Sequence, residues 1–333
     1  MNLFNFGATS RPAQAARLSS ATDLVQRTLA QHGLTAPNSV LNGLSPAQMS
    51  SDGTLIDGDT FTCPQGSRAY RTYVPTSAKD GVAGVIMMLH GCTQSSGDFE
   101  AGTGMHALAE AHHLVIVYPG QSLGDNAQIC WNWFRHGDQC HGMGEPAILA
   151  GLAKQITDQH AVKPHNTYVA GLSAGAAMAV ILGETYPDVF AAVGAHSGLP
   201  FGAATDMTSA FAAMMGTAGA RTVESNGPQT RTIVFHGTAD TTVHPSNSDA
   251  IARDVLDRAP RQTIDTTTRG ETGGRSWTRR IVAAQNNAAV LEQWTIEGLG
   301  HAWSGGSPKG SFTDAGGPDA SAQMVRFFLN NDD

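Results

Sequence analysis

The sequence has little positive charge. Its 20 Lys and Arg residues are outnumbered by 28 Asp and Glu residues, the formal net charge is −8, and no run of basic residues stands out. Binding to a nucleic acid or to an anionic membrane surface depends largely on a basic patch. The composition therefore argues against both kinds of partner.

Long apolar runs are also missing. The longest ones, such as residues 85–89 and 114–118, have the length of buried strands, whereas a membrane-spanning helix needs about 18 apolar residues or more. The N-terminus has no charged segment followed by an apolar one, as a secretory signal would have. We expect either that the protein is not exported by this route or that the sequence is a mature form.

Cysteine is scarce, with Cys63, Cys92, Cys130 and Cys140 in the whole chain. Their spacing fits no CxxC zinc pattern, and four cysteines allow three disulfide pairings. Cys130 and Cys140 could close a small loop, or either could reach Cys92. We expect disulfide bonding rather than free thiols, which would favour an oxidising compartment.

The pattern of the chain predicts an α/β fold, with a mostly parallel central sheet and helices on both faces. Hydrophobic residues make up 41% of the chain and there are 38 glycines, which suits a large core with many turns. Strand-like runs alternate with helical ones along the chain, and parallel strands need such crossovers. Strands are expected at 68–74, 85–89, 114–118, 167–170, 190–195, 232–235 and 290–296, helices at 101–112, 145–159, 174–186, 245–256 and 320–329, and a hairpin or exposed loop at 261–280.

Two parts are expected. Residues 1–50 resemble an appendage, because Leu18, Thr22, Val25 and Leu29 fall on one helical face. We interpret it as a helix packed on the main domain; the alternative is a docking helix for a polymer surface or a second subunit. Residues 51–333 are expected to form one larger domain, with no linker dividing them.

Gly171, Ser173 and Gly175 form a G-x-S-x-G motif. A strand is expected before the motif and a helix after it, which is the context in which it displays a nucleophilic serine. The glycines leave room for neighbouring backbone, and the helix N-terminus favours developing negative charge. The alternative is a simple tight turn, and the context favours the nucleophile.

A serine hydroxyl needs a base to take its proton. In this fold the acid and then the histidine follow later strands. Asp240 follows the expected strand 232–235, whereas Asp249 and Asp254 lie in a helical pattern. His301 follows the last expected strand, in a glycine-containing loop that starts at Gly298. We predict Ser173 as nucleophile, His301 as general base and Asp240 as its orienting acid.

Acyl transfer also needs donors for the oxyanion. One should be the backbone N–H of Ala174, directly after the nucleophile. The second should come from the loop after the strand 85–89, where we choose Cys92 and keep Thr93 as the alternative donor and as a substrate contact.

Aromatic residues gather where a substrate would lie. Trp131 and Trp133 are in the long segment 121–143, and Trp303 follows His301. We predict that these three side chains bind substrate; the alternative is that they are core residues. Metal is not expected, although His136, Asp138 and His141 lie close together in the same segment, because loop residues of these types are usually solvated.

The chain resembles the poly(3-hydroxybutyrate) depolymerase-type esterases, which are related to feruloyl and acetylxylan esterases of carbohydrate esterase family 1. The resemblance implies an α/β-hydrolase fold without a cofactor, assigns Ser173, Asp240, His301 and Cys92 their roles, and suggests polyester or carbohydrate-linked esters and, for many members, an extracellular location. It rests on segments in the family's order across residues 60–330: SRAYRTYVP, MMLHGCTQSSGDFEAGTGMHALAEAHHLVIVYP, CWNWF, GEPAILAGL, YVAGLSAGAAMAVILGETYPDVFAAVGAHSGLP, FHGTADTTV, GLGHAWSGG and DASAQMVRFFL.

Two functions follow. The first is ester hydrolysis through an acyl-enzyme, with polyhydroxyalkanoate-type polyesters or oligomers first, feruloyl or acetyl esters second and aromatic polyesters third. The second is a non-catalytic polymer-binding protein, which the ordered Ser, Asp and His argue against. The sequence carries no signal for an oligomeric state.

Overall fold

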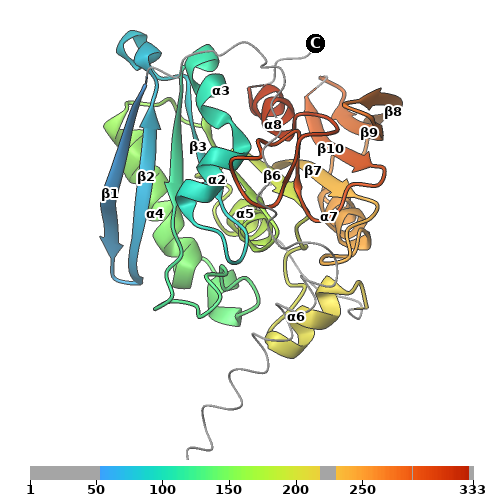
Figure 1. Ribbon diagram of the computed structural model, residues 1–333, viewed down its shortest axis with the longest axis horizontal. Coiled ribbons are helices and arrows are strands. Elements are labelled where there is room, and N and C mark those ends of the chain that lie inside the picture. The colour runs from blue at the N-terminus through green and yellow to red at the C-terminus, as the bar shows by residue number, and fades with distance from the viewer. Residues whose placement is uncertain (1–52, 218–229, 287, 330–333) are drawn as a thin grey trace, which may run out of the picture. The chain divides into compact units, whose positions relative to one another are not determined.

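The computed structural model describes residues 53–217, 230–286 and 288–329 (Figure 1). All of them belong to the compact unit that spans residues 49–333. The predicted N-terminal helix, and with it the whole predicted appendage, lies outside the described residues.

Ten strands of the described residues form one sheet, in the order β1-β2-β4-β3-β5-β6-β7-β10-β9-β8. The six central strands, from β4 to β10 in that order, are parallel, and the outer pairs at each end are antiparallel. This confirms the predicted α/β fold. The strands are β1 Thr54–Cys63, β2 Gly66–Val74, β3 Gly84–Leu89, β4 Leu114–Pro119, β5 Thr167–Leu172, β6 Ala192–His196, β7 Arg231–Gly237, β8 Thr263–Thr272, β9 Arg275–Ala284 and β10 Ala289–Ile296, with a small second pair, β11 Trp303–Ser304 and β12 Thr313–Asp314.

Helices cover both faces of the sheet and close two separate apolar cores. Helices α4, α5 and α7 supply side chains to one core, and α2, α3 and α8 supply the other. Strands β3, β4 and β5 are buried along their whole length, which explains why they read as continuous apolar runs. The helices are α2 Ser96–Thr103, α3 Met105–His112, α4 Gly144–Gln159, α5 Ala174–Thr185, α6 Met207–Met214, α7 Ser246–Leu256 and α8 Ala320–Phe328.

Three local expectations are corrected or refined. The single helix expected at 101–112 is two helices, because Gly104 adopts a left-handed φ of 65° between them. The hairpin alternative holds for residues 263–284, where β8 pairs with β9. Strand β1 and helix α6 were not expected. β1 is almost wholly exposed, so that no buried face marked it in the sequence.

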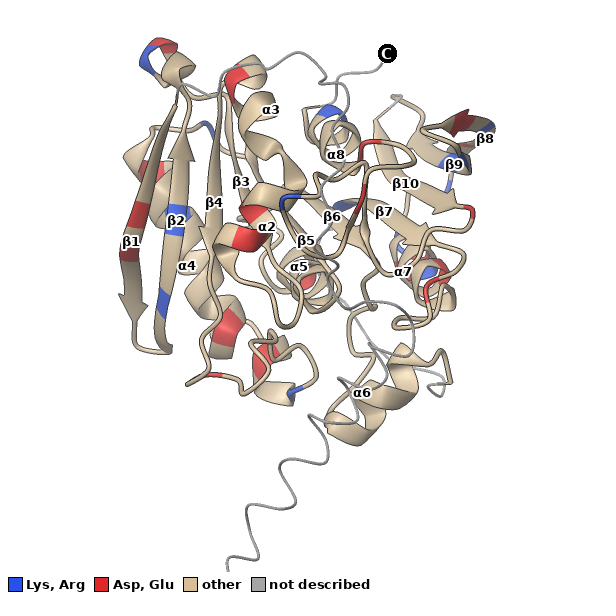
Figure 2. Cartoon of the chain, viewed as in Figure 1, with Lys and Arg blue, Asp and Glu red and all other residues tan. Residues whose placement is uncertain are grey.

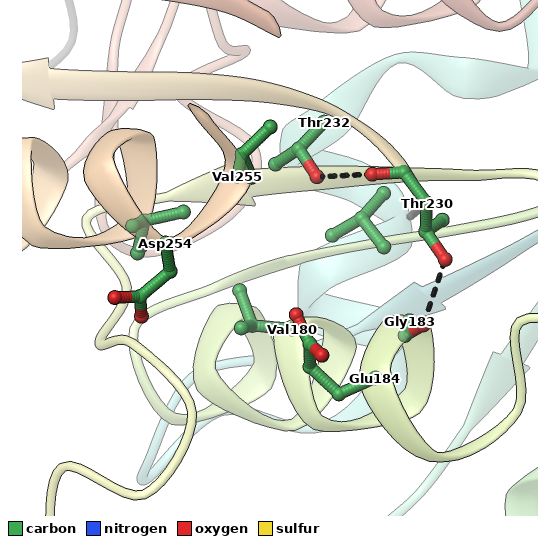
Figure 3. Close-up of a pocket in the computed structure, with 9 residues that line it drawn as sticks. Val180, Gly183, Glu184, Thr230, Thr232, Asp254 and Val255 are labelled. Carbon is green, nitrogen blue, oxygen red and sulfur yellow. Dashed lines mark hydrogen bonds between the residues drawn. The ribbon is translucent and has the colours of Figure 1, made fainter. Parts of the chain in front are cut away.

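The carboxyl ends of the parallel strands are the edge from which the candidate residues project. Helix α6 carries no Lys, Arg, Asp or Glu residue (Figure 2). A small cavity lies between α5, α7 and the amino end of β7, next to Thr230 and Thr232 (Figure 3). Its volume of about 10 Å³ suits roughly one water molecule. Because it lies at the amino end of a strand, it is separate from that edge.

Two buried histidines stand at the carboxyl ends of β3 and β6. Nε2 of His90 accepts the Gln121 N–H at 3.1 Å, and Nε2 of His196 accepts the Ser304 N–H at 3.1 Å. Both rings are therefore neutral, with the proton on Nδ1. Burial lowers the pKa of His90 to about 4 and the pKa of His196 to about 3.

These shifts predict that the free energy of unfolding falls as the pH drops from about 6.5, the ordinary histidine pKa, towards 4. Between these pH values the two histidines take up protons in the unfolded chain but stay neutral in the folded protein. The largest contribution of His90, whose pKa is lowered from 6.5 to about 4, is roughly 3 kcal/mol. Urea unfolding across this range measures the fall. The variant His90→Asn should be less stable than the wild type at neutral pH but should lose less stability on acidification. An unchanged slope in His90→Asn would contradict the assignment.

Candidate active site

Ser173 lies in a sharp turn between β5 and α5. Its φ of 57° and ψ of −120° are unusual for a residue other than glycine, and such strain is found mostly at functional sites. The turn brings backbones into close contact: a Cβ added at Gly175 would lie 2.1 Å from the Leu89 carbonyl oxygen, and one at Gly171 would lie 2.4 Å from Gly175. The predicted strand–turn–helix context is confirmed, and the steric reason for both glycines is visible.

Asp240 and His301 are joined by a hydrogen bond. Asp240 follows β7 and His301 follows β10, two neighbouring parallel strands. Nδ1–H of His301 donates to Oδ2 of Asp240 at 2.8 Å, and Oδ1 accepts the N–H groups of Thr242 and Val243 at 2.9 Å each. Both side chains are buried. With the proton held on Nδ1, Nε2 of His301 is the ring nitrogen able to accept another one.

Asp240 stays ionised although it is buried. Burial by itself would raise its pKa, but the hydrogen bonds and charges of His236 and His301 outweigh burial and hold the pKa well below its usual range. His236 is a second histidine against this carboxylate: its Nε2 lies 3.4 Å from Oδ2 and 2.8 Å from the Val243 carbonyl oxygen. Sequence reasoning missed this role, and the signal available was a histidine at the end of the strand that leads to Asp240.

The nucleophile turn and the base loop are tied together through His196. The Ser173 N–H donates to the His196 carbonyl oxygen at 2.9 Å, and the ring of His196 accepts the Ser304 N–H, three residues after His301. Sequence reasoning missed this link as well. Among the contacts of the described residues there is no hydrogen bond from the Ser173 hydroxyl to Nε2 of His301; in unliganded enzymes such bonds are often long and tighten only with substrate.

The loop after β3 lies beside Ser173 and leaves one backbone donor free. Gly91 is in close reach of the nucleophile: a Cβ added there would lie 3.6 Å from Cβ of Ser173. The Thr93 N–H already donates to the Gln128 carbonyl oxygen at 3.0 Å, which argues against Thr93 as the donor to an oxyanion. In the part of the chain that the structure describes, the Cys92 N–H has no acceptor. Ala174, at the first position of α5, has no i−4 partner within the helix.

A disulfide links this loop to the long segment after β4. Cys92 is bonded to Cys130, one of the pairings left open above, while Cys63 and Cys140 are free thiols. Within the segment, Trp131 Nε1 donates to the His90 carbonyl oxygen at 3.0 Å. The segment is itself anchored by buried Glu145, which accepts the Asn132 N–H at 2.7 Å. The long segment therefore restrains the loop that carries Cys92.

The expectation that three tryptophans bind substrate is corrected. Trp303 is 1% exposed, Trp131 is 0% exposed and Trp133 is 6% exposed. Trp303 also packs its ring edge to face with Phe99 and donates Nε1–H to Ser321. These large rings fill the two apolar cores, which was the alternative reading. Thr93 is exposed and lies next to Cys92, so it remains a candidate contact.

Two of the three residues considered for a metal, Asp138 and His141, have other partners. Oδ1 of Asp138 accepts the Glu145 N–H at 2.7 Å, and Nδ1 of His141 lies 2.7 Å from the Thr185 carbonyl oxygen. Over residues 53–217, 230–286 and 288–329, no group of three His, Cys, Asp or Glu side chains could hold a metal ion. Within the same residues, no helix has the length and apolar character needed to cross a membrane.

Comparison with known proteins places this chain in a family. The family model described as Esterase PHB depolymerase matches residues 68–276. Poly(3-hydroxyalkanoate) depolymerase C of Paucimonas lemoignei is 34% identical over 263 residues, which are 74% of this chain and 61% of that protein. A probable acetylxylan esterase A of Aspergillus clavatus is 28% identical over 237 residues, 66% of this chain and 76% of the relative. The chain thus spans about three fifths of the depolymerase's length.

The fold has a solved counterpart. An acetyl xylan esterase from Aspergillus awamori superposes with a TM-score of 0.64 at 19% identity, over 83% of this chain and 99% of that one. At this identity the likeness shows the α/β-hydrolase fold alone. The family match, which covers most of the catalytic sheet and includes Ser173 and Asp240, shows more: the chain belongs to the Esterase PHB depolymerase family.

Proposed function

We propose that the protein is a serine esterase that hydrolyses carboxylic esters through an acyl-enzyme. The observation that carries the proposal is the strained Ser173 at the same sheet edge as the buried Asp240–His301 pair. Esterases and depolymerases among its relatives support it. No cofactor enters the proposed reaction.

The reaction would run in two halves. Nε2 of His301 takes the hydroxyl proton as Oγ of Ser173 attacks the ester carbonyl, and Asp240 stabilises the imidazolium that forms. The N–H groups of Ala174 and Cys92 are the proposed donors to the tetrahedral oxyanion. His301 then returns the proton to the departing alcohol. In the second half, water attacks the acyl-enzyme by the same route and releases the acid.

For the substrate, we favour polyhydroxyalkanoate-type polyesters or their oligomers. A relative that is 34% identical over 74% of this chain is named as a poly(3-hydroxyalkanoate) depolymerase. Acetylxylan-type esters are the second candidate, because several relatives carry that name. Feruloyl esters and aromatic polyesters come after these two. The disulfide supports an oxidising setting, in keeping with the extracellular location that the family resemblance implies.

Replacing the nucleophile tests the reaction. Ser173→Ala should lose nearly all turnover of a short p-nitrophenyl ester, since the attacking oxygen is gone; a loss on the order of 10⁶-fold in kcat is expected for a residue of this kind. A fluorophosphonate probe should label the wild type at Ser173 and leave the variant unlabelled. Wild-type turnover in Ser173→Ala would end the proposal, and an unlabelled wild type would favour a polymer-binding protein instead.

A substrate panel tests the choice of ester. We expect kcat/KM for 3-hydroxybutyrate oligomers to exceed that for acetylated xylo-oligosaccharides, methyl ferulate and an aromatic diester by tenfold or more, about 1.4 kcal/mol in transition-state binding. Ser173→Ala supplies the background rate for each compound. A preference for the acetylated sugar would move the proposal to the second candidate without affecting the reaction type.

Removing the disulfide tests the proposed oxyanion donor. In the double variant Cys92→Ser, Cys130→Ser, the Cys92 N–H loses a covalent anchor. We expect kcat to fall by about tenfold to 100-fold, less than the 10²–10³ that complete loss of a donor costs, and stability to fall by about 2–4 kcal/mol. The matched control Cys63→Ser, Cys140→Ser changes free thiols outside this loop and should keep the wild-type kcat. Equal kcat values in both double variants would contradict the role of the disulfide.

A further inference from the structure

A hydrogen-bonded bridge joins the loop that carries Cys92 to the loop that follows His301. Its centre is Gln94, which is 2% exposed. Oε1 of Gln94 accepts the Gly91 N–H at 2.9 Å, on the oxyanion side. Nε2–H of Gln94 donates to the Ser311 carbonyl oxygen at 3.0 Å, on the base side, and to Oδ2 of Asp98 at 2.8 Å. The two loops are 217 residues apart in the chain.

Asp98, in the first turn of α2, completes the bridge. Oδ1 of Asp98 accepts the Ser311 N–H at 2.9 Å, and Oδ2 accepts the Ser311 hydroxyl at 2.6 Å. Over the described residues, no ion pair of Asp98 with a Lys, Arg or His is found. The Asp98 carboxylate thus accepts hydrogen bonds from uncharged donors on both loops, Gln94 on one and Ser311 on the other. Such charge-assisted bonds are stronger than neutral ones.

The far end of the bridge reaches the base. Phe312 follows Ser311, and its carbonyl oxygen accepts the Trp303 N–H at 2.7 Å. The Phe312 ring lies edge to face with the His301 ring, with centroids 6.5 Å apart. The position of Ser311 therefore sets the position of a side chain that contacts His301.

The near end of the bridge reaches the proposed oxyanion donor. Gly91, held by Gln94, directly precedes Cys92, and the Gln94 N–H donates back to the Gly91 carbonyl oxygen at 3.3 Å. The disulfide to Cys130 holds the same loop from its other side. Without the bridge, the covalent anchor would restrain only one side of this short turn.

We propose that Asp98 is a positioning residue that acts through Gln94 and Ser311 to hold the Cys92 donor and the His301 base at a fixed separation. The proposal rests on the proposed esterase function. In acyl transfer, the donor and the base act on the same tetrahedral centre, and misplacement by about 1 Å can cost about 100-fold in rate. A link between the two loops directly restrains the distance between the donor and the base.

The test compares Asp98→Asn with a matched control, Asp158→Asn. Asp158 is an exposed aspartate in α4, for which no side-chain bond is found among the described residues. In Asp98→Asn, the new amide N–H group faces donors on Gln94 and Ser311. We expect kcat for a soluble p-nitrophenyl ester to fall by about tenfold to 100-fold with KM within about twofold, while Asp158→Asn stays at the wild-type value. Rates are taken per active site, counted with a fluorophosphonate probe.

A second variant separates positioning from folding. Ser311→Ala, at an exposed position, removes the two hydroxyl bonds, to Asp98 and from Gln94, and should lower kcat per active site by a few-fold. The double variant Asp98→Asn, Ser311→Ala should lose no more than Asp98→Asn alone, because both changes break one bridge. If Asp98→Asn fails to fold, the kcat of Ser311→Ala decides by itself.

The outcomes are distinct. A kcat per active site in Asp98→Asn and Ser311→Ala equal to that of Asp158→Asn would overturn the bridge and leave the esterase proposal intact. Losses confined to the number of labelled sites would show a structural role and overturn positioning. A wild type without ester turnover or labelling at Ser173 would instead remove the function on which the inference rests.

Discussion

The hydrogen bond between His301 and Asp240 depends on one constraint, the parallel order β5-β6-β7-β10. Parallel strands place all their carboxyl ends at one edge of a sheet, and ligands of open α/β sheets bind at that edge. Ser173, His196, Asp240 and His301 come from these four strand ends. Reversing any one strand would move its residue to the far edge, where the small cavity beside Thr230 lies.

The second constraint is the burial of the carboxylate. A buried ionised group is costly unless it is paired and hydrogen-bonded. Asp240 meets this requirement with two backbone donors on Oδ1 and the His301 ring on Oδ2, with His236 close by. His196 and His90 avoid the cost of a buried charge because they stay neutral, and their Nε2 atoms accept backbone N–H groups. The site therefore combines one fixed negative charge with two uncharged imidazoles, those of His90 and His196.

Local patterns in the sequence predicted much of the fold and led to the main hypothesis about the site. The buried strands and the G-x-S-x-G turn are local, so that their residues alone indicate them. Other features depend on the whole fold. The sequence suggested that Trp303 faces substrate because it follows His301, but the packing of Phe99 and Ser321 against the ring buries it. The choice among the disulfide pairings and the partner of Thr93 depend on a long segment whose path has no periodic signal.

The loop that carries Cys92 shows why such distant contacts matter. It has no regular secondary structure, so neither a helix nor a strand ladder fixes its backbone. Its Thr93 N–H is held by Gln128, Cys92 is bonded to Cys130, and Gly91 is held by Gln94. The first two restraints come from the long segment after β4, whereas Gln94, which holds Gly91 from within the loop, is itself bound to Ser311. Electrostatic stabilisation of an oxyanion requires donors that are oriented before the charge develops. A short irregular loop can meet that requirement only if the surrounding structure restrains it from both sides, which is the arrangement found here.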